Sequence, residues 1–270
     1  MMKYSILYNK CITRREDSAL ILYFSVTGNS EYVAKRLAAA LDDEAVSITE
    51  CIRNERYLFK IKEGEDVGLI SPVYAWTLPY FVGDFINKST FEFNGTPYVY
   101  FVATYGRNAG NSANNVKADF AHHKLKLKAQ FGVKMVDTFT PFYYVNDAKD
   151  NASVEKKTDS QIDKIVEHIK NKDADKYIKD IASPLAARIA QAYYEKARKT
   201  DKFTVGEGCT GCGRCQEVCP EGIIKIEDGK PVWTDSACLL CLACYHHCPA
   251  NAIQHGKSTK GKGQYINPNI

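Results

Sequence analysis

The sequence of 270 residues predicts a doubly wound α/β domain built on a parallel sheet, followed by a small α+β domain of a different kind. Two observations carry this prediction. Continuous apolar runs alternate with helical stretches through the first part of the chain, and eight of the ten cysteines fall between Cys209 and Cys248. A composition of 45% hydrophobic and 25% charged residues is typical of globular proteins.

The apolar runs predict the strands of the sheet. They lack the alternation of a half-exposed strand, so they indicate strands buried on both faces. The runs are residues 19–24, 67–70, 98–103 and 133–136. Helical patterns lie between them, the strongest at residues 31–41, where Val33, Leu37 and Leu41 share one face, and weaker ones at 80–87 and 111–120.

Two further helices are expected before the cysteines. Thr158 and Gln161 have the spacing of a capping box and precede an apolar stripe, which predicts a closing helix from this point. Ser183 followed by Pro184 predicts the start of a connector helix that runs to about Lys199. One face of this connector is expected to pack the two domains into a fixed arrangement, through Leu185, Ile189, Ala192 and Tyr193.

The cysteines form two copies of the pattern C-x2-C-x2-C-x3-C-P. Three cysteines on one tight loop can reach three corners of an iron–sulfur cube, whereas the fourth ligates the other cube. The pattern therefore predicts two interlocked [4Fe-4S] clusters. One uses Cys209, Cys212, Cys215 and Cys248, and the other uses Cys238, Cys241, Cys244 and Cys219.

Zinc and disulfides are the alternatives. Structural zinc usually takes two separated C-x2-C pairs, which leaves the third cysteine of each repeat unexplained. A dense disulfide framework would require a secreted protein. Cys11 and Cys51 stand alone, and both are expected to be small buried side chains without a metal role.

A possible phosphate loop follows the first predicted strand. Ser25, Thr27, Gly28, Asn29 and Ser30 open the first helix, whose free N–H groups and positive dipole end can bind a phosphate without a lysine. The sequence lacks G-x-G-x-x-G and the Gly-Lys pair of a triphosphate loop, which argues against NAD and ATP.

The resemblance to known families rests on these motifs. Residues 209–253, including the Asp228-Gly229 turn, resemble a bacterial two-cluster ferredoxin, and the Ser/Thr loop resembles the FMN phosphate loop of flavodoxins. Two further loops lie at the carboxyl ends of strands, where doubly wound sheets bind ligands. They contribute the remaining expected FMN contacts: Pro72, Val73, Tyr74, Ala75, Trp76, Thr104, Tyr105, Gly106, Asn108 and Gly110. Tyr74, Trp76 and Tyr105 are candidates for stacking on the flavin, although each could equally be core packing.

From about residue 19 to the end, including Tyr265, Asn267 and Pro268, the chain resembles flavodoxin–ferredoxin fusion proteins of anaerobes. This resemblance implies a flavodoxin-like FMN domain (residues 19–182), a helical connector (183–202) and a ferredoxin-like domain (203–256) with two clusters. Residues 1–18 are an N-terminal extension. Residues 257–270 are expected to form a solvated tail, whose Lys257, Lys260 and Lys262 do not point to a nucleic-acid partner, and a docking role of this tail stays open.

The leading functional hypothesis is an electron carrier that passes electrons between the clusters and FMN and serves an unidentified redox protein. The alternative is a flavin-dependent reductase of a small substrate, fed by its own clusters, because fold alone does not decide function. A third hypothesis is a binding module with a degenerate flavin site and structural clusters. No catalytic residues are assigned. The sequence predicts a cytoplasmic location without a membrane span or a signal peptide. The net charge of +4 names no partner, and the sequence leaves the oligomeric state open.

Overall fold

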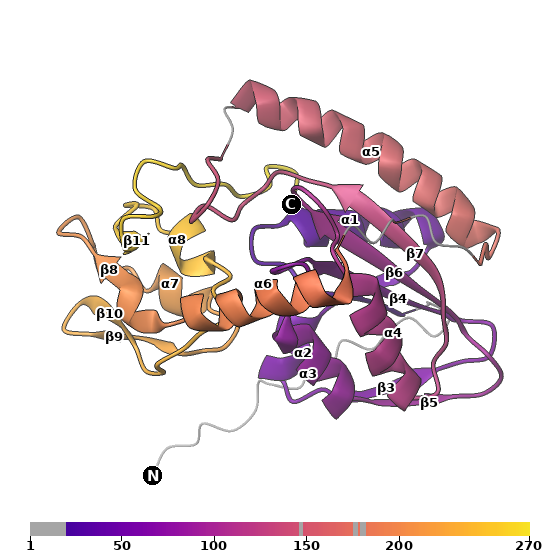
Figure 1. Cartoon of the computed structure of the whole chain (residues 1–270). Helices are drawn as coiled ribbons and strands as arrows, with labels where there is room; N and C mark the ends of the chain where they lie inside the picture. The colour runs from indigo at the N-terminus through magenta and orange to yellow at the C-terminus, as the bar shows by residue number, and fades with distance from the viewer. Residues whose placement is uncertain (1–19, 146–147, 175–177, 179–181) are drawn as a thin grey trace, which may run out of the picture.

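The computed structural model describes residues 20–145, 148–174, 178 and 182–270. A parallel five-stranded sheet covered by helices forms the larger part, and a small cysteine-rich domain lies beside it (Figure 1). The strand order is β2-β1-β4-β6-β7, with every neighbouring pair parallel. The chain therefore passes on both sides of β1, which confirms the predicted doubly wound fold.

The central strands are the predicted apolar runs. β1 (Leu20–Tyr23), β4 (Asp66–Pro72) and β6 (Tyr98–Tyr105) are buried along almost their whole length. The prediction for 133–136 was misplaced, since β7 (Leu127–Lys134) begins earlier and alternates between buried and partly exposed residues. As an edge strand, β7 does not produce a continuous apolar run.

Among the residues that the structure describes, three strands and one helix of the larger domain were not predicted, because each is only four to six residues long and mixes apolar with polar residues. β2 (Glu44–Ser47) forms the other edge of the sheet, and α2 (Ile48–Arg53) follows it at once. β3 (Leu58–Ile61) and β5 (Thr90–Phe93) form a separate parallel pair.

Helices cover both faces of the sheet (Figure 1). The helices α1 (Asn29–Leu41) and α5 (Ala148–Lys170) pack on one face in a core that includes Leu37 and Ile162. The helices α3 (Tyr80–Lys88) and α4 (Ser112–His122) pack on the other face, in the core that also contains Cys51, buried as expected. Cys11 lies outside the described residues. None of the described helices has both the length and the apolar character needed to cross a membrane.

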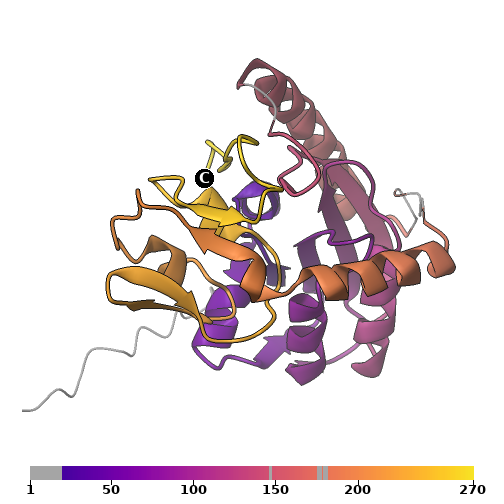
Figure 2. The ribbon, with the colours of Figure 1, turned by 60° about the vertical axis from the view of Figure 1, so that its left-hand side comes forward.

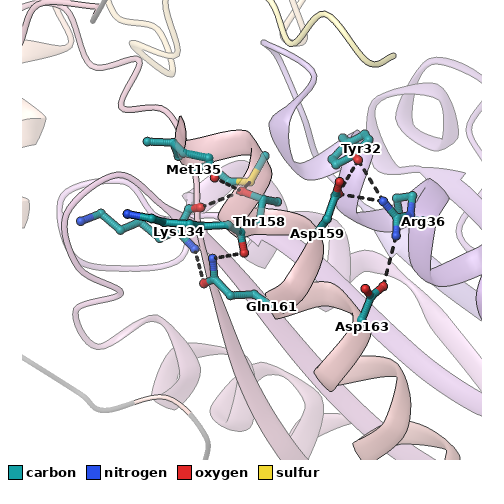
Figure 3. A network of polar contacts seen from close by, with 10 residues as sticks. Tyr32, Arg36, Lys134, Met135, Thr158, Asp159, Gln161 and Asp163 are labelled. Atoms are coloured by element: carbon teal, nitrogen blue, oxygen red, sulfur yellow. Dashed lines mark hydrogen bonds and ion pairs between the residues drawn. The ribbon is translucent and has the colours of Figure 1, made fainter. Parts of the chain in front are cut away.

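The predicted helix start at Thr158 was wrong. The helix α5 begins ten residues earlier, and Thr158 lies inside it, where its hydroxyl donates to the carbonyls of Lys134 (3.1 Å) and Val154 (3.1 Å). Gln161 accepts a hydrogen bond from the Lys134 N–H at 3.1 Å (Figure 3). The capping-box pattern therefore marks the pairing of α5 with the free edge of β7.

Polar contacts also join α5 to α1 (Figure 3). Arg36 forms ion pairs with Asp159 (2.7 Å) and Asp163 (3.2 Å), and the Tyr32 hydroxyl donates to Asp159. These half-exposed contacts add to the apolar packing of α1, which is the helix that begins at the candidate phosphate loop.

The cysteine-rich domain contains two antiparallel strand pairs and two short helices. β9 (Ile224–Glu227) and β10 (Lys230–Trp233) form a hairpin around Asp228 and Gly229, both at positive φ, as the sequence predicted. β8 (Phe203–Val205) pairs with β11 (Ile253–His255). Each cysteine loop leads into a single-turn helix, α7 (Arg214–Glu217) or α8 (Ala243–His246).

The connector helix α6 (Pro184–Ala197) exists, but the face expected to pack the domains together was the wrong one. Leu185, Ile189 and Tyr193 are each at least 60% exposed. The opposite face makes the contacts through Gln191, which donates to Thr77, and Tyr194, whose hydroxyl donates to the Leu239 carbonyl. Hydrophobic periodicity favoured the other face because this one combines the polar Gln191 with Tyr194 and small alanines, although Tyr194 is buried in the ferredoxin core. Figure 2 shows α6 leading from the larger domain to the cysteine-rich domain.

The prediction of a solvated tail was also wrong. Lys257 and Lys260 are exposed, but Thr259, Tyr265 and Asn267 are buried. In Figure 1 the C-terminus lies beside the start of α1. The tail therefore returns from the cysteine-rich domain to the larger one.

Candidate functional site

The eight clustered cysteines surround two separate cavities in the small domain. The first is lined by Cys209, Cys212, Cys215 and Cys248. The second is lined by Cys219, Cys238, Cys241 and Cys244. Each cavity thus combines three cysteines of one repeat with the fourth cysteine of the other, the grouping that interlocked clusters require.

The chemistry of these cavities fits iron–sulfur clusters. The cysteines of both cavities are free thiols, and backbone N–H groups point at two of the sulfurs, from Leu240 to Cys238 (3.2 Å) and from Ala252 to Cys248 (3.3 Å). Burial raises the pKa of the Cys238 thiol to about 12. Since a buried thiolate is costly without a compensating positive charge, such a sulfur is suited to a metal centre that supplies this charge.

The two cavities differ in their exposure. In the first cavity Cys212 is exposed and Cys209 partly exposed. In the second cavity three cysteines are buried, and the fourth, Cys241, packs against the core of the large domain. We call the cavities the outer and the inner cysteine site, respectively.

The inner site is held against the large domain by polar contacts. Arg53 on α2 donates to the carbonyl of Cys219 at 3.1 Å, and Tyr80 on α3 hydrogen-bonds to the Glu221 carboxylate. Arg198 donates to the Cys238 carbonyl at 2.6 Å and also lies over the Tyr80 ring, 4.2 Å from its centre. These contacts fix the inner site relative to the sheet.

The candidate phosphate loop lies at the start of α1, as expected. Gly28 precedes the helix at φ 88°, a left-handed conformation that favours glycine. Thr27, Asn29 and Ser30 are all buried, and Asn29 donates from its side-chain amide to the Val136 carbonyl at 3.1 Å. Buried hydroxyls beside a helix N-terminus suit the phosphate of FMN.

The structure brings the three predicted loops together, with Thr104 at their junction. Its hydroxyl lies 2.7 Å from the Ser30 hydroxyl, and its carbonyl accepts from the Val73 N–H at 3.1 Å, directly after Pro72 at the end of β4. Ser25 follows β1 at the same edge of the sheet. The first, second and third loops thus meet beyond the carboxyl ends of β1, β4 and β6, where doubly wound sheets bind their ligands.

The second and third loops touch closely. Ala75 and Trp76 turn the second loop at positive φ, and the Trp76 carbonyl accepts from the Asn111 N–H at 2.6 Å. A Cβ on Gly110 would lie 2.3 Å from the Trp76 carbonyl oxygen, so only glycine fits there. Asn108 accepts from the Gly110 N–H at 3.2 Å. Gly106 lies against Asp137, from the segment after β7.

The three aromatic candidates occupy different places. Trp76 is 40% exposed, and Tyr105 is half-buried beside Gly132. Tyr74 packs against both the core of the large domain and that of the cysteine-rich domain. Burial raises the pKa of Tyr74 well above its usual value, and the nearby Cys241 thiol contributes to this shift. Tyr74 therefore lies between the second loop and the inner cysteine site.

Sequence reasoning missed the groups that other segments bring to the phosphate loop. The Asn267 N–H donates to the Thr27 carbonyl at 2.8 Å, and His247 Nε2 lies 2.7 Å from the Val26 carbonyl. Both residues are more than 200 positions away in the chain. Their positions could not be derived from local patterns, although the similarity of the tail to that of the fusion proteins marked Asn267 as a residue of interest.

Comparisons with known protein families agree with this architecture. The model described as "Flavodoxin domain" matches residues 20–147, and a model described as "4Fe-4S dicluster domain" matches residues 208–253. A second model with the description "4Fe-4S dicluster domain" matches residues 138–223. This second match contains only the first cysteine repeat, whereas the match to residues 208–253 contains both.

Similar proteins match a short part of this chain. An uncharacterized ferredoxin of Methanocaldococcus jannaschii is 47% identical over 51 residues, which are 17% of this chain and 66% of that protein. The DNA-directed RNA polymerase subunit Rpo3 of Methanosarcina mazei is 41% identical over 51 residues, 18% of this chain and 19% of that subunit. The chain thus spans just under two thirds of the first relative and about a fifth of the second.

Among solved structures, rubredoxin oxygen:oxidoreductase from Desulfovibrio gigas is similar at 15% identity and a TM-score of 0.32, covering 59% of this chain and 37% of that one. An azoreductase from Bacillus anthracis is similar at 9% identity and a TM-score of 0.30, covering 64% of this chain and 99% of that one. Similarities of this size do not bear on function.

The chain carries a flavodoxin domain followed by a 4Fe-4S dicluster ferredoxin domain. This pair of domains implies electron transfer. The dicluster domain with its eight cysteines implies two [4Fe-4S] clusters, and the flavodoxin domain suggests FMN.

Proposed function

We propose that this protein is an electron carrier that passes electrons between two [4Fe-4S] clusters and FMN within one chain. One observation carries the proposal: Tyr74, on a candidate flavin loop, packs on the ferredoxin core, while Cys241 of the inner site packs on the flavodoxin core. When bound, the clusters exchange single electrons and FMN exchanges one or two.

The residues proposed to hold these groups are those that line the sites described above. Cys209, Cys212, Cys215 and Cys248 would hold the outer cluster, and Cys219, Cys238, Cys241 and Cys244 the inner one. Backbone N–H groups and hydroxyls of residues 25–30 would hold the FMN phosphate, and the loops at residues 72–76 and 104–110 would hold the flavin ring. Packing of Tyr74 between the two domains would exclude water from the space between the inner site and the flavin loops.

The exposure of the cysteines suggests an order for the three centres. The outer site includes the exposed Cys212, whereas the inner site lies against the flavodoxin core. A redox partner protein would therefore exchange electrons with the outer cluster first. The inner cluster would link the outer cluster to the flavin.

The division of the chain into a flavodoxin-like domain (19–182), a connector (183–202), a ferredoxin-like domain (203–256) and a tail (257–270) belongs to this proposal. So does a cytoplasmic location, because free cysteines that serve as metal ligands persist in a reducing compartment. The partner in this proposal is another redox protein.

The FMN assignment is tested with Thr27→Val in anaerobically purified protein. Loss of a hydrogen bond to a charged phosphate should weaken FMN binding by about 1.5 to 3 kcal/mol, measured by titration of flavin fluorescence. Thr90→Val, at an exposed position of β5, is the matched control and should bind FMN as the wild type does. Riboflavin should bind the wild type less tightly than FMN, and equal affinities would exclude the phosphate loop as the FMN site.

A further inference from the structure

The ferredoxin domain and the C-terminal tail supply hydrogen-bond donors to the phosphate loop of the flavodoxin domain. The Asn267 N–H donates to the Thr27 carbonyl at 2.8 Å, and the Asn267 side-chain amide donates to Asn29 Oδ1 at 3.2 Å. His247 Nε2 lies 2.7 Å from the Val26 carbonyl, so the tautomer with hydrogen on Nε2 donates to it. Three residues of the loop, Val26, Thr27 and Asn29, are thus held from outside their own domain.

The contact around Asn267 is closely packed. Asn267 is 1% exposed, and its Oδ1 accepts from the Asn269 N–H at 3.0 Å. A Cβ built on Gly28 would lie 2.5 Å from Ile270 Cδ1 and 3.0 Å from Asn267 Cβ. Glycine at position 28 therefore allows both the left-handed turn and the close approach of the tail, because a larger side chain would displace the tail from the loop.

The tail is anchored on the segment that joins the two cysteine sites. The Tyr245 hydroxyl donates to the Gly263 carbonyl at 2.7 Å, and the Gln264 side-chain amide donates to the Cys248 carbonyl at 2.9 Å. The Tyr265 N–H donates to His246 Nδ1 at 3.3 Å. This anchoring segment runs from Cys244 of the inner site to Cys248 of the outer site, so its position depends on both.

The hydrogen bonds to the loop carbonyls also orient the N–H groups of the same peptide units. In a peptide unit the N–H and C=O groups point in opposite directions, so fixing a carbonyl also fixes the N–H of the following residue. The carbonyls of Val26 and Thr27 precede the N–H groups of Thr27 and Gly28, which lie in the loop that suits a phosphate. Groups that are oriented before binding raise affinity because less freedom is lost on binding.

We propose that Asn267 is a positioning residue of the FMN site, which the ferredoxin part and tail complete by orienting the phosphate-binding loop. The proposal rests on the assignment of FMN to this loop. It makes flavin retention depend on the folded state of the cluster domain, which is a coupling between two binding sites. Couplings of this kind typically change an affinity by about 5- to 150-fold.

The experiment compares Asn267→Ala with wild type in the cluster-loaded, full-length protein. The substitution removes the side-chain bonds to Asn29 and Asn269, which hold the Asn267 backbone N–H against the Thr27 carbonyl. Titration of flavin fluorescence should give a dissociation constant for FMN at least about fivefold higher in the variant. Riboflavin, which lacks the phosphate, should bind both proteins equally, an outcome that a general loosening of the domain would not give. Asn269→Ala is the matched control, since its exposed side chain can be removed while its N–H still donates to Asn267.

A second readout needs no flavin. Hydrogen exchange of the amides of residues 26–30 should be faster in flavin-free Asn267→Ala than in flavin-free wild type, with the iron content unchanged. Equal FMN affinity and equal exchange in the two proteins would overturn the inference and leave the proposed function intact. Loss of iron from the variant would also overturn it, because the tail would then support the clusters instead of the loop. Failure of wild type to bind FMN would reject the proposed function, and the inference with it.

Discussion

The two cysteine loops have identical spacing and opposite surroundings. Between its first three cysteines the outer loop carries Gly211 and Gly213, and the inner loop carries Leu240 and Leu242 at the same positions. All four residues have positive φ, from 49° to 78°. Glycine adopts this conformation without strain, whereas a leucine pays about 1–2 kcal/mol for it.

Burial explains why the inner loop tolerates leucine. Leu240 and Leu242 are 3% and 1% exposed, and burying a leucine fully contributes about 1.5–3 kcal/mol, enough to offset the strain. The neighbouring Leu239 is part of the core of the flavodoxin domain. The ligand spacing therefore specifies the clusters, and the residues between the ligands specify which cluster faces the other domain.

Removal of iron should have the largest effect, and it should unfold one domain and leave the other folded. Five of the fourteen buried residues in the ferredoxin core are cysteines of the two sites, so this domain has little core without its clusters. Chelation is expected to unfold the segment after Phe203 while the flavodoxin domain stays folded on its two cores. Hydrogen exchange resolved by segment measures both at once, and protection that persists in residues 203–256 would contradict the prediction.

Substitution of the fourth cysteine of either repeat should damage one cluster and leave the other intact. Cys219→Ala should damage the inner cluster, although Cys219 belongs to the outer repeat in sequence, because it lines the inner cavity. Cys248→Ala is the matched variant and should damage the outer cluster. Iron content and the electron paramagnetic resonance of each reduced variant distinguish the two. Loss of the cluster within the same repeat would reverse the assignment.

A smaller effect is expected from making the inner loop resemble the outer one. The outer cluster should lose iron to a chelator before the inner cluster, since Cys212 is exposed. Leu242→Gly relieves the strain at positive φ but removes a buried side chain, and large-to-small changes of this kind cost about 2–5 kcal/mol. Iron release from the inner cluster should therefore accelerate toward the outer rate. Unchanged release would show that burial of Leu242 does not protect this cluster.

Local patterns in the sequence predicted the elements that they encode directly. The apolar runs gave β1, β4 and β6 because a central parallel strand is buried on both faces. The cysteine spacing predicted the grouping around the cavities because the reach of a tight loop is local geometry. The short edge strand β2 and the short helix α2 have no apolar run or motif of this kind.

Contacts between distant segments could not be predicted in this way. The apolar stripe of α6 is exposed, while the contacts of this helix are made by Gln191 and Tyr194 on its other face. Likewise, nothing near Asn267 in the sequence indicates that it bonds to Thr27. Such contacts depend on where the two domains meet, which follows from the shape of both surfaces and not from periodicity.

Electron equilibration within the chain tests the central claim most directly. Packing of the inner site on the flavodoxin core keeps the flavin loops and the clusters at high effective concentration, so electron exchange should be an intramolecular step. After partial reduction under anaerobic conditions, the absorbance changes of clusters and flavin should relax at a rate independent of protein concentration, and Cys238→Ala should slow or abolish this relaxation. A rate that rises in proportion to protein concentration would mean that the centres communicate only between molecules, and would contradict the account.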